Sequence, residues 1–198
     1  MKKLALLLSL APTLALAATS TWNVDASHSQ VGFAVKHLVI SNVRGEFGAY
    51  QGKLVLDESD VTKSTVEATI DVSSISTKVA DRDAHLKSAD FFDAAKYPTI
   101  TFKSKKVAKA GKDELKVTGD LTLHGVTKPV VLDVSTSPEV KGMFGETRRG
   151  FAATTTIDRK DYGLTWNKLV EAGPAVGDQV RIVLDLELVK DQPKTASR

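Results

Sequence analysis

Cysteine is absent from this chain of 198 residues, and aromatic residues make up only 6% of it. Without cysteine, no disulfide can brace the fold and no thiolate can act as a nucleophile, so a hydrophobic core must supply the stability. The sequence also holds no Gly-x-Ser-x-Gly elbow, no Walker loop and no dinucleotide fingerprint. These absences favour a binding or structural role, and we assign no catalytic residue.

The first residues differ in composition from the rest of the chain. Lys2 and Lys3 precede an apolar run over residues 4–16, and Ala15-Leu16-Ala17 forms a small-x-small cleavage site. This pattern is typical of a secretory signal peptide, and the run is short for the alternative, a membrane anchor. We therefore expect residues 1–17 to be removed on export and the mature protein to be periplasmic or secreted.

The charge of the mature protein is close to balanced. The chain has 27 basic and 24 acidic residues, so loss of Lys2 and Lys3 leaves 25 against 24. Such a domain is a poor candidate for binding nucleic acid. Lysines gather around one predicted hairpin, at positions 103, 105, 106, 109 and 112. A solvated sheet edge is the simpler interpretation, and a transient contact with an anionic membrane is the alternative.

Apolar and polar residues alternate along segments such as 66–72, 115–123 and 180–188. A period of two places one set of side chains inside and the other in water, which predicts antiparallel strands. We expect eight to ten of them, over residues 21–24, 29–37, 45–50, 53–57, 65–72, 99–107, 114–123, 126–134, 150–157 and 179–189. A sheet with one apolar face closes into a barrel or folds into a sandwich. The small and medium-sized inward residues favour a hollow barrel.

The other predicted features are turns, one helix and a tail. Turns are expected at Gln51-Gly52 and at His124-Gly125. A short helix is expected over residues 77–88, with Thr77 as its N-cap. It could cover one end of the barrel. One domain is expected over residues 18–190, followed by a flexible polar tail over residues 191–198.

We predict no metal site among the four histidines. No His-x-x-x-His pair occurs among His28, His37, His85 and His124. Asp81 and His85 are spaced i,i+4 and could share a metal or a hydrogen bond. Histidines bonded at the barrel rim are the simpler interpretation, with contact to a ligand headgroup as the alternative. Arg82 could bind a phosphate or quinone oxygen, or pair with a neighbouring aspartate.

Seven segments, taken in order, carry a resemblance to a known family. They are residues 22–29 (WNVD to HS), 31–37 (VGFAVKH), 85–93 (HLKSADFFD), 97–100 (YPTI), 118–127 (TGDLTLHGVT), 158–164 (DRKDYGL) and 176–178 (VGD). Together they resemble the YceI family of secreted bacterial proteins, over residues 22–189. The resemblance implies an all-β, lipocalin-like antiparallel barrel of about eight strands with one short helix. It also implies a periplasmic carrier or store, sometimes induced by stress, without cofactor or established catalytic residue.

The resemblance further implies an isoprenoid lipid, of the polyprenyl or prenylquinone type, along the inside of the barrel. With the alternation, it predicts cavity contacts from Val31, Phe33, Val35, Ala68, Ile70, Ile100, Phe102, Leu121, Leu123, Ile182 and Leu184. A headgroup is expected at the mouth, near His37, Arg82, His85, Leu86, Phe91 and Phe92. The alternatives are an enzyme acting on a lipid or quinone and a structural barrel with a filled core. An exposed strand edge or the helix could also support a homodimer.

Overall fold

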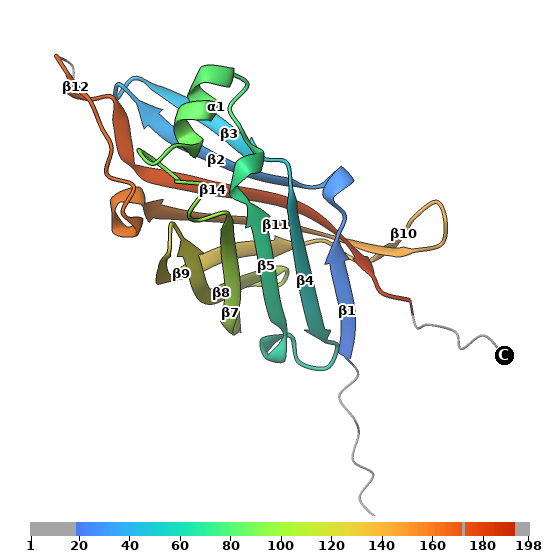
Figure 1. Cartoon of the computed structure of the whole chain (residues 1–198). Coiled ribbons are helices and arrows are strands. Elements are labelled where there is room, and N and C mark those ends of the chain that lie inside the picture. Colours follow the sequence, from blue (N-terminus) through green and yellow to red (C-terminus); the bar gives the residue numbers. More distant parts are fainter. Residues whose placement is uncertain (1–18, 172, 193–198) are drawn as a thin grey trace, which may run out of the picture.

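The computed structural model describes residues 19–171 and 173–192. Eight of its antiparallel strands form a closed barrel (Figure 1). The predicted signal peptide and residues 193–198 of the predicted tail lie outside this range. The barrel strands are β1 (Thr19–Val24), β4 (Tyr50–Asp57), β5 (Thr65–Asp71), β7 (Thr99–Lys109), β8 (Glu114–Leu123), β9 (Val126–Thr136), β11 (Thr147–Asp158) and β14 (Val176–Lys190). The predicted fold class is confirmed.

Closure comes from the pairing of β11 with β14. The strands follow the order β11-β9-β8-β7-β5-β4-β1-β14, and β14 returns to β11 in a register that runs from Arg148↔Val189 to Asp158↔Gln179. Closing the sheet leaves no free edge along this seam and turns the apolar side of every strand toward one interior. The apolar residues of the alternating pattern therefore face the interior of the barrel, and the polar residues face the solvent.

Three further strands extend the same sheet from the edge of β14 that holds β1. β1 pairs only with the last residues of β14, at positions 188–190, and β2 (Gln30–His37) pairs with residues 176–185. β3 (Ser41–Phe47) follows β2, and β6 (Ile75–Ser76) follows β3. β2, β3 and the long strand β14 lie together above the other strands in Figure 1. The strand expected over residues 29–37 is present as β2, but the sequence did not predict that β2, β3 and β6 extend the sheet beyond the eight barrel strands.

The predicted turn at Gln51-Gly52 is wrong. β4 runs through both residues and pairs with β5, while β3 has ended at Phe47 and does not pair with β4. Gly52 has a packing role instead, because a Cβ atom there would lie 2.8 Å from Cγ2 of Val24. At His124-Gly125 the predicted two-residue turn is present, and both residues have positive φ, 51° and 75°.

The helix α1 (Ala80–Lys87) starts later than predicted, and Thr77 is not its N-cap. Val79 holds that position without a side-chain cap. Thr77 instead donates its backbone N–H and its hydroxyl to the Asp83 carboxylate, at 2.7 and 2.5 Å, so the acid of the first turn reaches back toward the preceding strand. Within the described residues, no helix is long and apolar enough to cross a bilayer.

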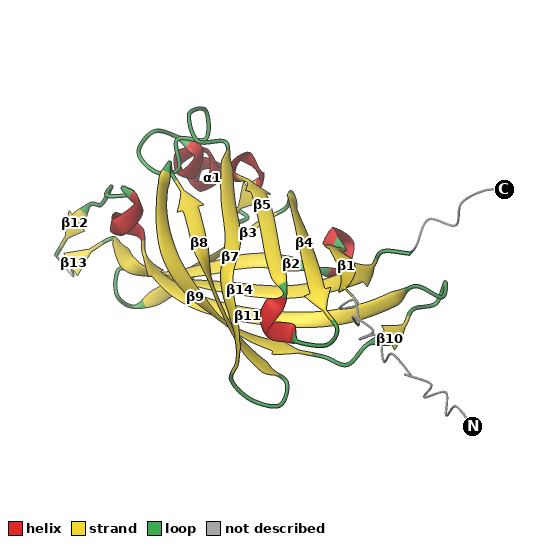
Figure 2. Cartoon of the chain, turned by 90° about the horizontal axis from the view of Figure 1, so that it is seen from below, coloured by secondary structure: helices red, strands yellow, loops and turns green. Residues whose placement is uncertain are grey.

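Short elements complete the chain, and most of them connect long strands. They are η1 (Ala26–His28), η2 (Val61–Lys63), η3 (Val72–Ser74), β10 (Val140–Lys141), η4 (Arg159–Tyr162), β12 (Leu169–Val170) and β13 (Gly173–Pro174). Figure 2 shows the β12–β13 hairpin projecting from one end of the molecule and β10 at the other. Asp191, the first residue of the predicted tail, donates its backbone N–H to the Thr21 carbonyl at 2.7 Å.

Candidate binding cavity

A cavity of about 280 Å³ lies inside the barrel. Its wall is made by inward side chains of the barrel strands together with β2, β3 and the segment that follows α1. Almost all of these side chains are aliphatic or aromatic. Ligand pockets in proteins usually measure roughly 300–1,000 Å³, so this volume lies just below that range. The interior is hollow rather than filled from end to end.

All eleven residues predicted as cavity contacts lie in its wall. They are Val31, Phe33, Val35, Ala68, Ile70, Ile100, Phe102, Leu121, Leu123, Ile182 and Leu184. Each sits at an inward position of a strand, as a period of two requires. Their contact with a ligand stays a prediction, because the structure carries none.

The six residues predicted at the mouth divide into two groups. Leu86, Phe91 and Phe92 line the cavity, whereas His37, Arg82 and His85 are not part of its wall. His37 is exposed at the end of β2. The contact of these polar residues with a headgroup therefore stays a prediction, without support from the shape of this cavity.

The polar atoms of Arg82 and His85 have protein partners. Arg82 donates from Nε and Nη2 to the hydroxyl and carbonyl of Thr77, at 2.7 and 2.9 Å. It forms no ion pair with an aspartate in the part of the chain described here. His85 Nε2 lies 2.9 Å from Oδ2 of Asp90, so its carboxylate partner is Asp90 and not Asp81. Both side chains thus fix the ends of α1.

Aromatic rings pack together where the segment after α1 lies next to β2 and β3. The ring centre of Phe47 lies 5.9 Å from that of Phe33 and 6.1 Å from that of Phe92, and the Phe47 and Phe92 rings are T-shaped to each other. The ring centres of Phe91 and Trp166 are 5.1 Å apart. Aromatic pairs at such distances are favourable beyond their buried area. We call Phe47, Phe91, Phe92 and Trp166 the aromatic cover; the first three line the cavity, and Trp166 packs against Phe91.

Arg159 is a cavity-lining residue that sequence reasoning missed as a site residue. It is 4% exposed, and its guanidinium donates to the carbonyl oxygens of Leu164, Trp166, Val176 and Gly177 and to the Asp178 carboxylate. Burial lowers the pKa of Arg159, against the opposing effect of Asp178. Because these donors are used, Arg159 fixes the two backbone segments that flank β12 and β13 rather than awaiting a ligand. Arg159 and its partners in residues 176–178 stand in two of the seven family segments, but those segments do not show that the guanidinium bonds backbone carbonyls.

Tyr50 is a second missed residue of the cavity wall. Its hydroxyl donates to the Ser29 carbonyl at 2.6 Å, which joins β4 to the residue before β2. Burial, followed by the charge of Glu46, raises the pKa of Tyr50, so the hydroxyl stays protonated at neutral pH. This bond bridges the barrel where β1 has ended and no ladder connects β4 to β2.

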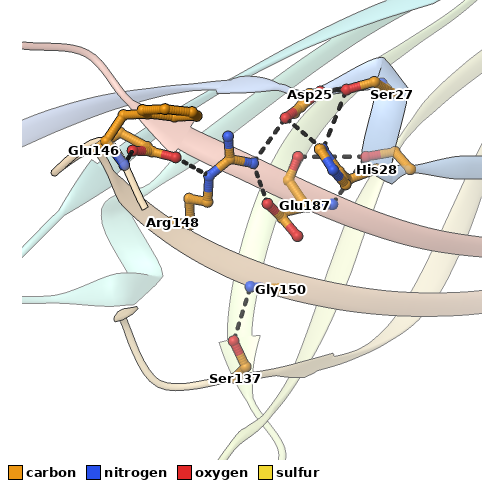
Figure 3. A network of polar contacts seen from close by, with 10 residues as sticks. Asp25, Ser27, His28, Ser137, Glu146, Arg148, Gly150 and Glu187 are labelled. Carbon is orange, nitrogen blue, oxygen red and sulfur yellow. Dashed lines mark hydrogen bonds and ion pairs between the residues drawn. The ribbon is translucent and has the colours of Figure 1, made fainter. Parts of the chain in front are cut away.

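A network of charges holds the point where the chain passes from β1 to β2 (Figure 3). Arg148 on β11 donates to Asp25, at 2.8 Å, to Glu146, at 2.7 Å, and to Glu187. Hydrogen bonds from Ser27, His28 and Arg148, in decreasing order, hold the pKa of Asp25 well below its usual range. Ligand atoms of Asp25, His28 and Glu187 lie close enough to share a metal ion. Arg148 already supplies the positive charge between the carboxylates of Asp25 and Glu187, so we interpret the cluster as a network of ion pairs.

Comparison with known proteins decides the family. The model of the YceI-like domain matches residues 22–188. This chain belongs to the YceI family. A UPF0312 protein of Vibrio cholerae is 39% identical over 153 residues, which are 77% of this chain and 81% of that protein. The family predicted from the seven segments is confirmed.

Solved structures show the same YceI fold. BcnA of Burkholderia cenocepacia superposes with a TM-score of 0.74 at 25% identity, covering 83% of this chain and 98% of BcnA. A polyisoprenoid binding domain from Saccharophagus degradans gives a TM-score of 0.62 at 18% identity, covering 86% and 98% of the two chains. At that identity the second likeness concerns the fold alone. The fold of this YceI protein is therefore shared with solved structures.

Proposed function

We propose that this YceI protein binds an isoprenoid lipid, of the polyprenyl or prenylquinone type, and carries or stores it. The observation that carries the proposal is the hollow, apolar interior of a closed barrel. The name of the Saccharophagus degradans domain, which has the same fold, supports an isoprenoid over other apolar ligands. An interior lined almost entirely by hydrocarbon suits a flexible hydrocarbon chain better than a compact polar ligand.

The driving force is the removal of hydrocarbon from water. Each buried methylene contributes about 0.8 kcal/mol, so one five-carbon isoprenoid unit contributes about 4 kcal/mol before the cost of ordering it. A volume of about 280 Å³ is small for a long chain. We therefore expect a long lipid to occupy the interior only with movement of wall side chains, and we expect the aromatic cover to move most.

The hydrogen bonds made by the polar side chains of the cavity wall favour a binding function over catalysis. An enzyme acting on a lipid or quinone needs a polar group poised toward the ligand. The guanidinium of Arg159 and the hydroxyl of Tyr50 instead donate mainly to backbone carbonyls. Their arrangement holds the wall in place, which a carrier requires.

Blocking the interior tests the proposal. Ile70→Trp and Leu121→Trp place an indole where the lipid chain would lie, and Val131→Trp places the same group on the outer face of β9, where Val131 is 44% exposed. With a fluorescent geranylgeraniol analogue as probe, we expect at least tenfold weaker binding for the two inward variants and unchanged binding for Val131→Trp. Circular dichroism and thermal melting identify any variant that fails to fold. Full affinity in both folded inward variants would place the site elsewhere.

Export is also a proposal, because residues 1–18 lie outside the described structure. We propose that the protein works in the periplasm or outside the cell after cleavage behind Ala17. N-terminal sequencing of the protein from the periplasmic and extracellular fractions tests this, and the expected first residue is Ala18. Recovery of the full chain from the cytoplasm alone would contradict it.

A further inference from the structure

Exposed apolar side chains from two distant parts of the sequence meet at one end of the molecule. After β2, Val39 is 62% exposed and Ile40 is 82% exposed, and on β12 Leu169 is 82% exposed and Val170 is 40% exposed. Single exposed apolar residues are common, whereas a group of four at one tip calls for an explanation. In Figure 1 and Figure 2, β12 stands at the far end of the long strands.

Ala175 joins the two segments. Its carbonyl accepts from the Leu38 backbone N–H at 3.0 Å, and its own N–H donates to the Lys168 carbonyl at 2.8 Å. A Cβ atom on Gly173 would lie 3.9 Å from Cγ2 of Val39. Residues 38–40 and 169–170 therefore form one continuous surface, which we call the apolar tip.

The apolar tip is held in shape at its base. Arg159 fixes the carbonyls of Trp166 and Val176, and Asn167 makes two hydrogen bonds with the backbone of Val176, at 2.6 and 3.1 Å. Leu38 and Val39 have φ values of 50° and 65°. Positive φ is unfavourable for a β-branched residue and persists only where surrounding contacts impose it. The backbone thus presents these side chains to the outside at a conformational cost.

Positive charge flanks the tip. Lys36 and Lys168 are exposed, and neither takes part in an ion pair within the described residues. Glu171 is the acidic residue of the same hairpin. Apolar side chains beside unpaired lysines match the surface of a bilayer with anionic headgroups, where hydrocarbon and negative charge lie within a few ångströms of each other.

We propose that the apolar tip docks on the surface of a bilayer that contains anionic phospholipid. Two narrow turns that project from the body fit between lipid headgroups, whereas a second copy of the chain would need a broader, flatter face. The tip is also continuous with the cavity. Val35 lines the cavity and lies three residues before Leu38, and Val176 lines it and directly follows Ala175, whose carbonyl accepts from the Leu38 N–H. Docking at the membrane would serve lipid exchange, and in that respect this inference rests on the proposed function.

The aromatic cover lies on the path between tip and cavity. Trp166 precedes Lys168 by two residues and contacts Phe91, which lines the cavity, and His85 of α1, at 5.1 and 4.9 Å between ring centres. Docking would therefore bring this cover to the bilayer surface. A lipid chain could then pass into the interior without crossing water.

The opposite end of the molecule offers a matched control. Met143 is 94% exposed and Phe144 is 90% exposed, in the turn between β10 and β11. These side chains are as apolar as those of the tip, but they belong to a single turn whose Phe144 backbone N–H donates to Glu146. If exposed hydrophobicity alone decided membrane binding, this turn would bind as well as the tip.

Vesicle co-sedimentation tests the proposal with the full mature protein. Vesicles of phosphatidylcholine with about a third phosphatidylglycerol should bind the protein, and pure phosphatidylcholine should bind it more weakly. I40D combined with L169D should weaken binding at least tenfold, since it exchanges buried hydrocarbon for charge. K36A combined with K168A should weaken it about fivefold per lysine. M143D combined with F144D should leave it unchanged.

Three outcomes would overturn the proposal. One is that the native protein fails to bind either kind of vesicle. Another is that the control pair M143D and F144D weakens binding while I40D and L169D do not. The last is that I40D and L169D convert a dimer into a monomer in analytical ultracentrifugation, which would make the tip a self-association surface. The cavity variant Ile70→Trp should still bind vesicles, so loss of the geranylgeraniol analogue in that variant reports on the proposed function alone.

Discussion

Nη1 of Arg148 lies 2.8 Å from Oδ2 of Asp25, although 123 residues separate them in the chain. Arg148 is near the start of β11, and Asp25 is the residue at which the chain leaves β1 for η1. The pair thus stabilises the junction at which the strand paired with this edge of β14 changes from β1 to β2. The backbone supports the same junction, because Asp25 donates its N–H to the Glu187 carbonyl at 2.8 Å.

This pairing predicts a dependence of stability on acid. The pKa of Asp25 is held below its usual value of about 3.9, so the folded protein keeps the carboxylate charged where the unfolded chain takes up a proton. The stabilisation is present in full above about pH 4 and is lost as the pH falls through the lowered folded value. Asp25→Asn should therefore reduce the free energy of unfolding at pH 7, and the difference from the native protein should narrow below pH 4. Urea unfolding at pH 7 and pH 3 checks this, and an equal difference at both values would contradict it.

Replacing Arg159 should cost far more than replacing an exposed arginine. Arg159→Met leaves the buried carbonyls of Leu164 and Trp166 without their donor, which should lower the free energy of unfolding by about 3 kcal/mol or more. Arg159→Lys supplies three donors without the planar fork and should recover only part of the loss. Arg181, exposed on β14, gives the control Arg181→Met, with a change within about 0.5 kcal/mol. Urea unfolding that ranks Arg159→Met with the control would refute the assigned role.

Two glycines in strands should respond differently to a methyl group. A Cβ atom on Gly119 would lie 2.5 Å from the Lys103 carbonyl oxygen and 2.5 Å from the Phe102 ring, and the carbonyl cannot move without breaking the β7–β8 ladder. On Gly32 the nearest atoms would be 3.5 Å away. Gly119→Ala should cost about 1–3 kcal/mol, and Gly32→Ala less than about 0.5 kcal/mol. Equal melting temperatures for the two variants would show that the backbone at Gly119 can yield.

A substitution at Tyr50 distinguishes a structural role of its hydroxyl from a role in contacting the ligand. Tyr50→Phe removes the donor to the Ser29 carbonyl and should lower stability by about 1 kcal/mol. The ring stays in the cavity wall, so the affinity for the geranylgeraniol analogue should remain within about twofold. Thermal unfolding and a probe titration measure the two effects. A large loss of affinity without a loss of stability would assign the hydroxyl to the ligand.

The positions that face the cavity could be predicted because alternation is a local signal. Whether Ile70 or Leu121 points inward depends on its own strand, and the period of two fixes that face. The seven segments added the family and hence the closed barrel. Gly52 shows where the same reasoning fails, since a glycine in a strand looks like a turn until its neighbour Val24, on another strand, is known.

The residues missed as site residues depend on partners that lie far away in the sequence or in loops. Tyr50 donates to a carbonyl 21 residues earlier, and Arg148 reaches Asp25, 123 residues away in the chain, across the single strand β14. Arg159 stands in one of the seven family segments, but its partners are mainly backbone carbonyls, which every residue possesses, so the segment does not reveal them. A strand over residues 29–37 was expected, but the extension of the sheet by β2, β3 and β6 was not. This extension is possible because β14 continues beyond the residues that pair with β1, which only the strand register shows.

The content of the cavity, in protein taken from its own compartment, tests the central claim most directly. Native mass spectrometry of the freshly isolated mature protein, followed by solvent extraction and mass spectrometry of the extract, reports the ligand mass and the subunit count together. We predict a species heavier than the chain by the mass of one isoprenoid lipid, and release of that lipid on extraction. Protein that carries only its own mass, with no apolar compound in the extract, would contradict the account.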